Sequence, residues 1–389
     1  MTNILLTGGR APATLELCRA FHHAQHHVFT AESVNGHLSQ FSNSVSKNFL
    51  VPPPRQQTHD FIHSLNSIVQ AFDINLIIPT CEEVFYIAAF RESITCPVFI
   101  DSFEKLAMLH NKWAFINKAR EFHLPVPETL LLSNQDDLHT AFSTWQDLVI
   151  KPAYSRFAKK TLILPSLQDA LHEISFEDNV LMVAQEYLSG KEISTYSICH
   201  NGHVTAHTTY ESNFTAGRTG TVLLSHVSHP SIETWVKTFV EGIQFTGQIA
   251  FDFIENSNSD IYAIECNPHA NGIPAALLSS HPQFTSAILE PTSECIKPEP
   301  GFSAMMAAGM LLYGLPASLR DGLVSRWFHD FVNSRDFLFR FNDPMPALFQ
   351  FQSLYYYFQL AKKKGISILE ATMFDIEWNG SSEFLLKEQ

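Results

Sequence analysis

Residues 247–272 read GQIAFDFIENSNSDIYAIECNPHANG, and the fold can be worked out from this stretch. Two runs rich in apolar residues, QIAFDFIE and IYAIEC, flank the polar turn NSNSD, which is the pattern of a β-hairpin. If the turn pairs Glu255 with Tyr262, then Asp252 lies directly opposite Glu265. Two carboxylates that face each other across a ladder repel and destabilise the sheet. A bound cation would remove this penalty.

The same register places Asn267 beside Ala250, on the face that carries both carboxylates. Two carboxylates and an amide oxygen form an oxygen-rich ligand set suited to Mg²⁺, which prefers few protein ligands and completes its shell with substrate phosphates. The alternative is a solvated outer face of the hairpin. Apolar residues on both faces, such as Phe251 and Ile254, favour a buried hairpin and therefore the metal site.

Size and charge limit the classes of function. The chain has 389 residues, enough for two or three domains, and its hydrophobic content of 45% is that of a globular protein. A formal net charge of −14 argues against a nucleic acid or an anionic membrane surface as the main partner. A small anionic ligand stays compatible, because a local positive pocket can lie inside an acidic surface.

Three further features predict a cytoplasmic protein. The opening residues MTNILLTGGR lack a basic start followed by an apolar segment, so we expect no signal peptide. The longest apolar run, residues 302–315, contains glycines and is too short for a membrane span. Six cysteines are scattered without a CxxC pair, which indicates reduced thiols in a cytosol.

Residues 1–100 alternate between short apolar strands and helices, which predicts an α/β fold with a parallel, Rossmann-like sheet. The first turn contains Gly8 and Gly9 but no GxGxxG, so we favour a structural turn over a dinucleotide site. We expect strands at residues 3–7, 28–31, 49–51, 76–78 and 98–100, and helices at 11–23, 59–72 and 83–90.

Beyond residue 100 the pattern changes to a mixture of hairpins and helices. The last stretch, 326–378, is rich in Phe and Tyr and is expected to be mostly helical. Other expected helices lie at 102–109, 111–122, 167–174, 231–242, 273–279 and 304–312, and expected strands at 129–132, 148–151, 161–164, 180–187, 193–200 and 203–210.

Four blocks of polar residues call for one chemical explanation. Lys112 lies on a helix, Lys151 ends a strand before the basic loop YSRFAKK, and the third block is QEYLSGKE at 185–192. The fourth block is the carboxylate face of the hairpin. Two lysines, a basic loop and a divalent-ion site are the parts that neutralise a triphosphate and transfer its γ-phosphoryl group.

The order of these blocks resembles the ATP-grasp superfamily, in particular its carboxylate–amine ligases. The blocks are Lys151, then Glu186-x-x-x-Gly190-x-Glu192, then Asp252 and Glu265-x-Asn267. The resemblance covers roughly residues 1–280. It implies an ATP site formed by Lys112 and Lys151 at the phosphates, Glu186, Tyr187 and Leu188 at the adenine and Glu192 at the ribose, with Asp252, Glu265 and Asn267 as Mg²⁺ ligands.

The resemblance also implies three domains and a reaction. Residues 1–100 would form the Rossmann-like domain that precedes the ATP-grasp domain. Residues 101–290 would form the ATP-grasp domain, with a lid at about 129–185 and a core of mixed or antiparallel sheet at about 186–290. The implied reaction joins a carboxylate to an amine through an acyl phosphate and releases ADP. The helical extension 291–389 lies outside the resemblance, and it could close the substrate pocket or form a homodimer interface.

Two positions depart from the pattern of the family. The loop after Lys151 contains no glycine, so Ser155, Arg156 and backbone N–H groups are the candidates for binding phosphate. His269 occupies the place where many relatives carry an arginine that clamps an anionic substrate. We expect Arg218, in ESNFTAGRTGT, to replace that arginine.

Structural roles compete with several of these assignments. Lys112 could be a surface lysine and Glu192 a solvated edge residue. Glu82 and Glu83 follow a predicted parallel strand, where ligands bind, and could hold an amine; Glu83 could instead cap the next helix. Asp343 and Asp375 are typical of turns and caps.

Three alternatives to the ligase remain open. One is an ATP-grasp enzyme that uses a non-amine acceptor, and another is a regulatory protein that binds nucleotide without turnover. A nicotinamide-dependent oxidoreductase is disfavoured by the missing GxGxxG.

Overall fold

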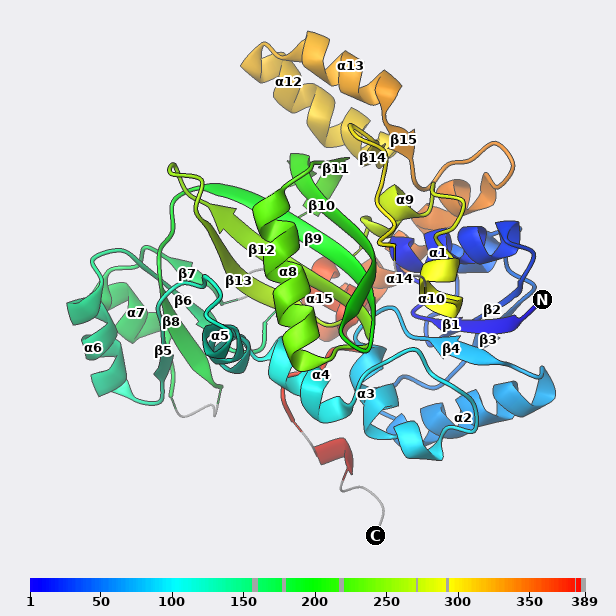
Figure 1. Ribbon diagram of the computed structural model, residues 1–389, viewed down its shortest axis with the longest axis horizontal. Coiled ribbons are helices and arrows are strands. Elements are labelled where there is room, and N and C mark those ends of the chain that lie inside the picture. The colour runs from blue at the N-terminus through cyan, green and yellow to red at the C-terminus, as the bar shows by residue number, and fades with distance from the viewer. Residues whose placement is uncertain are drawn as a thin grey trace.

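The computed structural model describes residues 1–155, 160–176, 180–216, 220–270, 272–291, 294–381 and 383–385. Three sheets organise the described chain, and Figure 1 shows them side by side, with the N-terminal sheet on the right, the large sheet in the centre and a small sheet on the left. The predicted mixed α/β fold is confirmed.

The N-terminal sheet is parallel and has the order β3-β2-β1-β4. Successive side chains of a strand point to opposite faces, so Ile4 and Leu6 pack with the first helix while Leu5 packs with the second. The elements are β1 (Asn3–Thr7), α1 (Pro12–His23), β2 (His27–Glu32), η1 (Leu38–Phe41), β3 (Lys47–Leu50), α2 (Thr58–Ala71), β4 (Leu76–Ile78), α3 (Glu83–Ala89) and η2 (Arg91–Ser93).

Two short helices lead out of this domain. Ser102 caps α4 (Phe103–His110) by accepting a hydrogen bond from the backbone N–H of Lys105, and Asn111 caps α5 (Lys112–Glu121) by accepting from that of Ala114. The cap at Asn111 fixes Lys112 at the first helical position of α5.

The small sheet is antiparallel, with the order β5-β8-β6-β7. Its two helices share one apolar cluster with the strands. The strands are β5 (Thr129–Leu132), β6 (Leu148–Pro152), β7 (Leu162–Ile163) and β8 (Met182–Glu186), and the helices are α6 (Gln135–Thr144) and α7 (Leu167–Glu173).

The large sheet has the order β13-β12-β9-β10-β11-β14-β15. One face packs on α5 and α8 (Pro230–Ile243) through aromatic side chains such as Phe251 and Phe253. On the opposite face Tyr196 joins the apolar cluster that contains β1 and α1. The strands are β9 (Lys191–His200), β10 (His203–Ala216), β11 (Gly220–His226), β12 (Gly247–Glu255), β13 (Ile261–Asn267), β14 (Ser303–Met305) and β15 (Arg335–Asp336).

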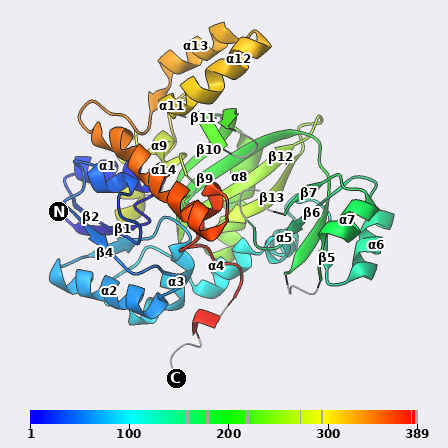
Figure 2. The same ribbon diagram turned by 180° about the vertical axis from the view of Figure 1, so that it is seen from behind.

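The C-terminal region is mostly helical, as predicted, and α12 and α13 project from the body of the molecule (Figure 1). Seen from behind, α14 crosses the surface near α1 and α15 (Figure 2). The remaining elements are α9 (Ala275–Leu278), α10 (Ser286–Leu289), α11 (Ala307–Gly309), the π-helix η3 (Met310–Gly314), α12 (Leu315–Asp321), α13 (Val324–Asn333), α14 (Met345–Lys364), α15 (Ile368–Met373) and η4 (Glu383–Leu385).

The hairpin of β12 and β13 forms with one correction to its register. Asp252 pairs with Glu265 and Ala250 with Asn267, as predicted. At the turn, however, Glu255 pairs with Ile261 and not with Tyr262. A bulge between Asp252 and Phe253 absorbs the difference, so the predicted carboxylate pairing holds although the predicted turn was wrong.

Other predictions of local structure also need correction. Helix α6 was missed, and residues 98–100 make only an isolated bridge from Val98 to Ile77. Residues 304 and 305, the start of an expected helix at 304–312, belong to β14 (Ser303–Met305). The stretch ESNFTAGRTGT at 211–221, which its polar sequence suggested was a loop, is mostly strand, because β10 continues to Ala216 and β11 begins at Gly220. These strands are paired by partners distant in sequence, which local patterns do not record.

Asp343 and Asp375 do not act as simple turn residues. Asp343 accepts hydrogen bonds from Arg19 and Ser42, and Asp375 pairs with Arg10. Both sets of bonds attach the C-terminal region to the N-terminal domain. Within the described part of the chain, no helix has both the length and the hydropathy needed to cross a bilayer.

Candidate active site

The carboxylate pair of Asp252 and Glu265 lies on the face of the large sheet that turns towards the N-terminal domain. Asp252 pairs with Ser194 of β9, and the next position on that face pairs Ala250 with Tyr196. The Ser194 hydroxyl donates to Asp252 Oδ1 over 2.6 Å. Burial, reinforced by the charge of Glu265, raises the pKa of Asp252 to about 6. The repulsion expected from the sequence is therefore present in the fold.

Lys112 supplies one positive charge to this pair. Its side chain is buried, and its Nζ lies 3.1 Å from Glu265 Oε1. Nζ also donates to the carbonyl oxygen of Ser155 over 3.2 Å, and the backbone N–H of Lys112 donates to the carbonyl of Ala153. Lys112 is thus not a surface lysine, and it connects the carboxylates to the loop that follows β6.

Lys151 supplies a second positive charge from the small sheet. Its buried Nζ donates to Gln185 Oε1 over 3.0 Å and to the carbonyl oxygen of Ile264 over 3.4 Å. Burial lowers its pKa to about 8; Glu265 opposes this shift and Lys112 adds to it. Two lysines from different elements therefore converge on the carboxylate pair.

These residues fit a magnesium ion. Asp252 and Glu265 share a face with Asn267, whose side-chain amide has no hydrogen-bond partner among the described residues. In that same part of the chain, no group of three or more His, Cys, Asp or Glu could hold a metal. A site with two carboxylates suits Mg²⁺, because this ion binds through one or two protein carboxylates and substrate phosphates.

The predicted adenine segment joins the small sheet to β9. The Glu186 side chain accepts from the backbone N–H of Glu128, and the N–H of Tyr187 donates to the carbonyl of Asp147. Among the described residues, none accepts a hydrogen bond from the N–H of Leu188. Glu192 is exposed and pairs with Ile254, one step along the face that carries Asp252.

Of the four residues predicted to bind anions, the structure describes His269 and Ser155. His269 is buried and its Nδ1 bonds to the carbonyl of Ala270. Ser155 is buried beside Lys112. Arg156 and Arg218 lie outside the described residues, so their roles stay predictions.

Glu83 and Glu82 are buried at the carboxyl edge of the N-terminal sheet. Glu83 Oε1 accepts from the Thr7 hydroxyl over 2.6 Å and from the N–H groups of Thr80 and Cys81, each over 3.1 Å. It therefore holds the turn before α3 and does not cap that helix. Burial raises the pKa of Glu83. Glu82 accepts from the backbone N–H of Trp378 over 3.0 Å.

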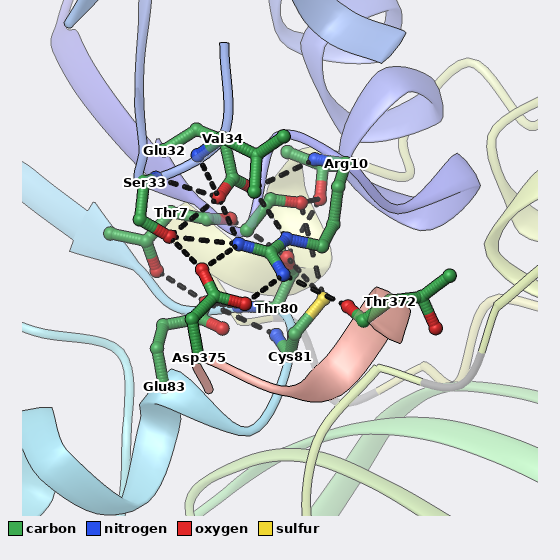
Figure 3. Close-up of polar contacts among 12 residues, drawn as sticks. Thr7, Arg10, Glu32, Ser33, Val34, Thr80, Cys81, Glu83, Thr372 and Asp375 are labelled. Carbon is green, nitrogen blue, oxygen red and sulfur yellow. Dashed lines mark hydrogen bonds and ion pairs between the residues drawn. The ribbon is translucent and has the colours of Figure 1, made fainter. Parts of the chain in front are cut away.

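Arg10 lies at the same edge and was missed as a site of interest. Figure 3 shows its guanidinium between the carboxylates of Glu32 and Asp375. Its Nη1 and Nη2 bond to the two oxygens of Asp375 over 2.6 and 2.7 Å. The sequence does contain a local signal for this pair: Gly8-Gly9 is followed directly by Arg10, and the next strand ends in Glu32.

Ser194 and Gln185, which position the carboxylate and the lysine, were also missed. Ser194 lies directly opposite Asp252 in the pairing of β9 with β12. Gln185 lies on β8, two residues beyond Val183, which lies opposite Lys151 on β6. Only the pairing of strands distant in sequence reveals them.

Comparison with known proteins identifies the domain in which these residues lie. The family described as ATP-grasp domain matches residues 109–272, a segment that contains Lys112, Lys151 and the carboxylate pair. No curated protein matches the sequence.

Solved structures match over most of the chain. The ADP complex of N5-carboxyaminoimidazole synthetase from Staphylococcus aureus has a TM-score of 0.64 at 13% identity and covers 82% of this chain and 86% of its own. Biotin carboxylase from Campylobacter jejuni scores 0.63 at 14% identity, with 76% and 73% covered. The L-amino acid ligase from Bacillus licheniformis scores 0.60 at 13% identity, with 77% and 78% covered.

At identities of 13–14% these structures establish only the fold of the chain. The family match establishes the domain formed by residues 109–272. The predicted resemblance is confirmed at both levels: residues 109–272 belong to the ATP-grasp domain family, and the chain has the ATP-grasp fold.

Proposed function

We propose that the protein is an ATP- and Mg²⁺-dependent ligase that joins a carboxylate to an amine through an acyl phosphate, releasing ADP and phosphate. One observation carries this proposal: two buried lysines from separate elements converge on a carboxylate pair within the ATP-grasp domain. The lysines would supply positive charge for the phosphates, and the carboxylates would supply negative charge for a metal ion.

In the proposed site Asp252, Glu265 and Asn267 would hold the magnesium ion, which would neutralise charge on the phosphate oxygens. Lys112 and Lys151 bind those oxygens from the other side. Because Glu265 already contacts Lys112, the nucleotide would replace that contact as it arrives. Glu186, Tyr187 and Leu188 would bind the adenine, with the N–H of Leu188 as donor, and Glu192 would accept from the ribose.

The proposed reaction has two steps. An oxygen of the substrate carboxylate attacks the γ-phosphorus, the bond to the β–γ bridging oxygen breaks, and ADP leaves. The amine then attacks the acyl carbon and phosphate leaves. We propose Ser155 and Arg156 at the phosphates and Arg218 and His269 at the acyl group. Acyl phosphates hydrolyse, so residues 129–185 would close as a lid over the core at 186–290 to exclude water.

Two of the similar solved structures support nitrogen as the acceptor without fixing the substrates. One is the L-amino acid ligase, and the other is a phosphoribosylamine–glycine ligase from Thermotoga maritima. We propose that Glu82 and Glu83 bind the amine: Glu83 Oε1 is engaged by Thr7, Thr80 and Cys81, whereas its Oε2 is buried and has no hydrogen-bond partner among the described residues.

A trapping experiment tests this function against its alternatives. The purified protein is incubated with MgATP and pools of carboxylic acids, with hydroxylamine as the nucleophile. The ligase predicts ADP and a hydroxamate for one acid, and an amide once the matching amine replaces hydroxylamine. ADP and hydroxamate without any amide indicate a non-amine acceptor. Nucleotide binding without ADP formation on any pool indicates a regulatory protein and contradicts the proposal.

We also propose a cytoplasmic homodimer. The six cysteines are all free, which is compatible with a reducing compartment. Residues 344–361, which form most of α14, contain no Asp, Glu, Lys or Arg, yet Leu348, Phe351 and Tyr355 are more than 60% exposed.

A second copy of the chain is the occupant that fits this face. The exposed apolar residues of α14 recur every three or four positions from Met345 to Phe358, so two copies could pack around a two-fold axis. Exposed aromatic and leucine side chains offer on the order of 100 Å² each, so the stripe and its flanks approach the ~800 Å² that each partner buries in a typical interface.

A further inference from the structure

Residues 375–381, which we call the C-terminal strap, run from the N-terminal domain to the loop that follows Lys151. The first anchor of the strap is Asp375, which binds Arg10 and Ser33 at the carboxyl edge of the N-terminal sheet (Figure 3). The backbone N–H of Arg55 donates to the carbonyl of Asp375 over 3.0 Å. This end of the strap is therefore fixed to the sheet by both side chain and backbone.

The middle of the strap is fixed to helix α3. The hydroxyl of Tyr86 donates to the carbonyl of Glu377 over 2.7 Å, and the backbone N–H of Trp378 donates to Glu82. The buried indole of Trp378 stacks on Phe85 with centroids 4.7 Å apart. Buried aromatic pairs of this kind restrict the orientation of both rings.

The far end of the strap contacts Tyr154. The rings of Trp378 and Tyr154 meet edge to face with centroids 5.3 Å apart. Gly380 has a φ of +85° and lies so close to Tyr154 that a Cβ atom would come within 2.5 Å of the ring. A Cβ at this position would push the Tyr154 ring aside, and the positive φ is one that glycine adopts without strain.

Tyr154 lies between two residues that bind Lys112. The carbonyl of Ala153 accepts from the backbone N–H of Lys112, and the carbonyl of Ser155 accepts from its Nζ. The same Nζ lies beside Glu265. The Tyr154 side chain therefore projects from the backbone segment that carries both acceptors of Lys112.

We propose that Trp378 and Gly380 are positioning residues of the nucleotide site: the strap holds Tyr154 so that Lys112 and the loop after β6 meet the phosphates. This inference rests on the proposed nucleotide site, and it gives the C-terminal region a function in ATP binding. The residues that carry it lie up to 226 positions apart in the sequence, from Tyr154 to Gly380.

The test compares the affinity for MgADP of two glycine variants by titration calorimetry. Gly380→Ala adds a methyl group against Tyr154, whereas Gly365→Ala adds one at a similar positive φ, +67°, where a Cβ meets nothing within 4 Å. We expect Gly380→Ala to weaken binding between about ten- and a hundredfold, because misplacement by about 1 Å has effects of this size in active sites. Gly365→Ala should bind as wild type.

A second pair of variants tests the route through Tyr154 if Gly380→Ala does not fold. Tyr154→Phe keeps the ring that packs against Trp378 and should bind nucleotide as wild type. Tyr154→Leu removes the aromatic ring and should bind about tenfold more weakly. Adding Gly380→Ala to Tyr154→Leu should cause little further loss, because the clash has gone.

Several outcomes would overturn the inference. Equal affinities for Gly380→Ala and Gly365→Ala would do so, as would wild-type affinity in Tyr154→Leu. The same loss from Gly380→Ala in both backgrounds would show that its effect does not pass through Tyr154. Wild-type protein that binds no nucleotide refutes the nucleotide site itself, and the positioning role with it; tight wild-type binding with unaffected variants refutes the positioning role alone.

Discussion

Replacing Asp252 by Asn should stabilise the nucleotide-free protein while removing its use of magnesium. Asp252 faces Glu265 across the hairpin, and burial with this neighbour raises its pKa from 3.8 to about 6. The isosteric amide can keep the hydrogen bond from Ser194, and its N–H₂ group can face Glu265 without repulsion. The variant therefore removes a charge that the unliganded fold accommodates poorly.

The sign of the pH dependence follows from the raised pKa. The folded protein holds the proton of Asp252 more tightly than the unfolded chain, so the favourable contribution is present below pH 3.8 and is lost as the pH rises through about 6. The difference between a pKa of 3.8 and one of about 6 corresponds to a destabilisation of the folded state by about 3 kcal/mol at neutral pH. Asn carries no such penalty, so its advantage grows as the pH rises from 3.8 and is complete above about pH 6.

Thermal unfolding of wild type and Asp252→Asn measures this difference. We expect the variant to melt several degrees higher near pH 8, since each kcal/mol shifts the melting temperature by about 2–4 °C for a domain of this size. Below pH 3.8, where Asp252 is protonated in both the folded and the unfolded chain, the two should melt together, and near pH 5 the difference should be intermediate. Asp260→Asn, an exposed change in the turn of the same hairpin, is the matched control. A variant that melts lower near pH 8, or an advantage that does not depend on pH, would show that the carboxylate pair does not repel in this way.

Three other predictions concern separate parts of the molecule. The ion pair with Arg10 lowers the pKa of Glu32 from 4.5 to about 2 despite its burial, so this pair contributes about 3 kcal/mol of stability above pH 4.5, which is lost as the pH falls to 2. Glu32→Gln should therefore melt lower than wild type at neutral pH, and the difference should shrink in acid. A difference in melting temperature that does not change with pH would contradict this role of the ion pair. Lys151→Met should lower kcat/KM for ATP about a hundredfold with little change in melting temperature; wild-type kinetics would exclude a phosphate contact. Phe351→Glu on α14 should convert a dimer to a monomer in light scattering, whereas a wild type that is monomeric at micromolar concentration would contradict the proposed interface.

Local chemistry made the hairpin and its carboxylates predictable from the sequence. The alternation of apolar residues identifies the two strands, and the pairing of Asp252 with Glu265 follows from an approximate turn. The bulge next to Asp252 could not be foreseen. It leaves Ile264 without a paired residue on β12, and nothing in the local sequence indicates this. The pairing was right since the bulge compensates an error of one residue at the turn.

The supporting contacts of the site were not predictable from the sequence. Trp378 packs against Tyr154 and Phe85, and Asp375 binds Arg10 across 365 positions of sequence. Single-sequence patterns describe neighbours along the chain, and they carry no information about which distant segments meet. For the same reason β11, β14 and β15 were missed, since each is recognisable as a strand only beside its partner.

The metal site itself is best tested by calorimetric titration of MgADP into wild type and into the double variant Asp252→Asn/Glu265→Gln. We predict that wild type binds the nucleotide in a magnesium-dependent manner, that the double variant loses this dependence while remaining folded, and that Asp260→Asn behaves as wild type. Magnesium-dependent binding of equal affinity in the double variant would contradict the assignment of this carboxylate pair as the metal site.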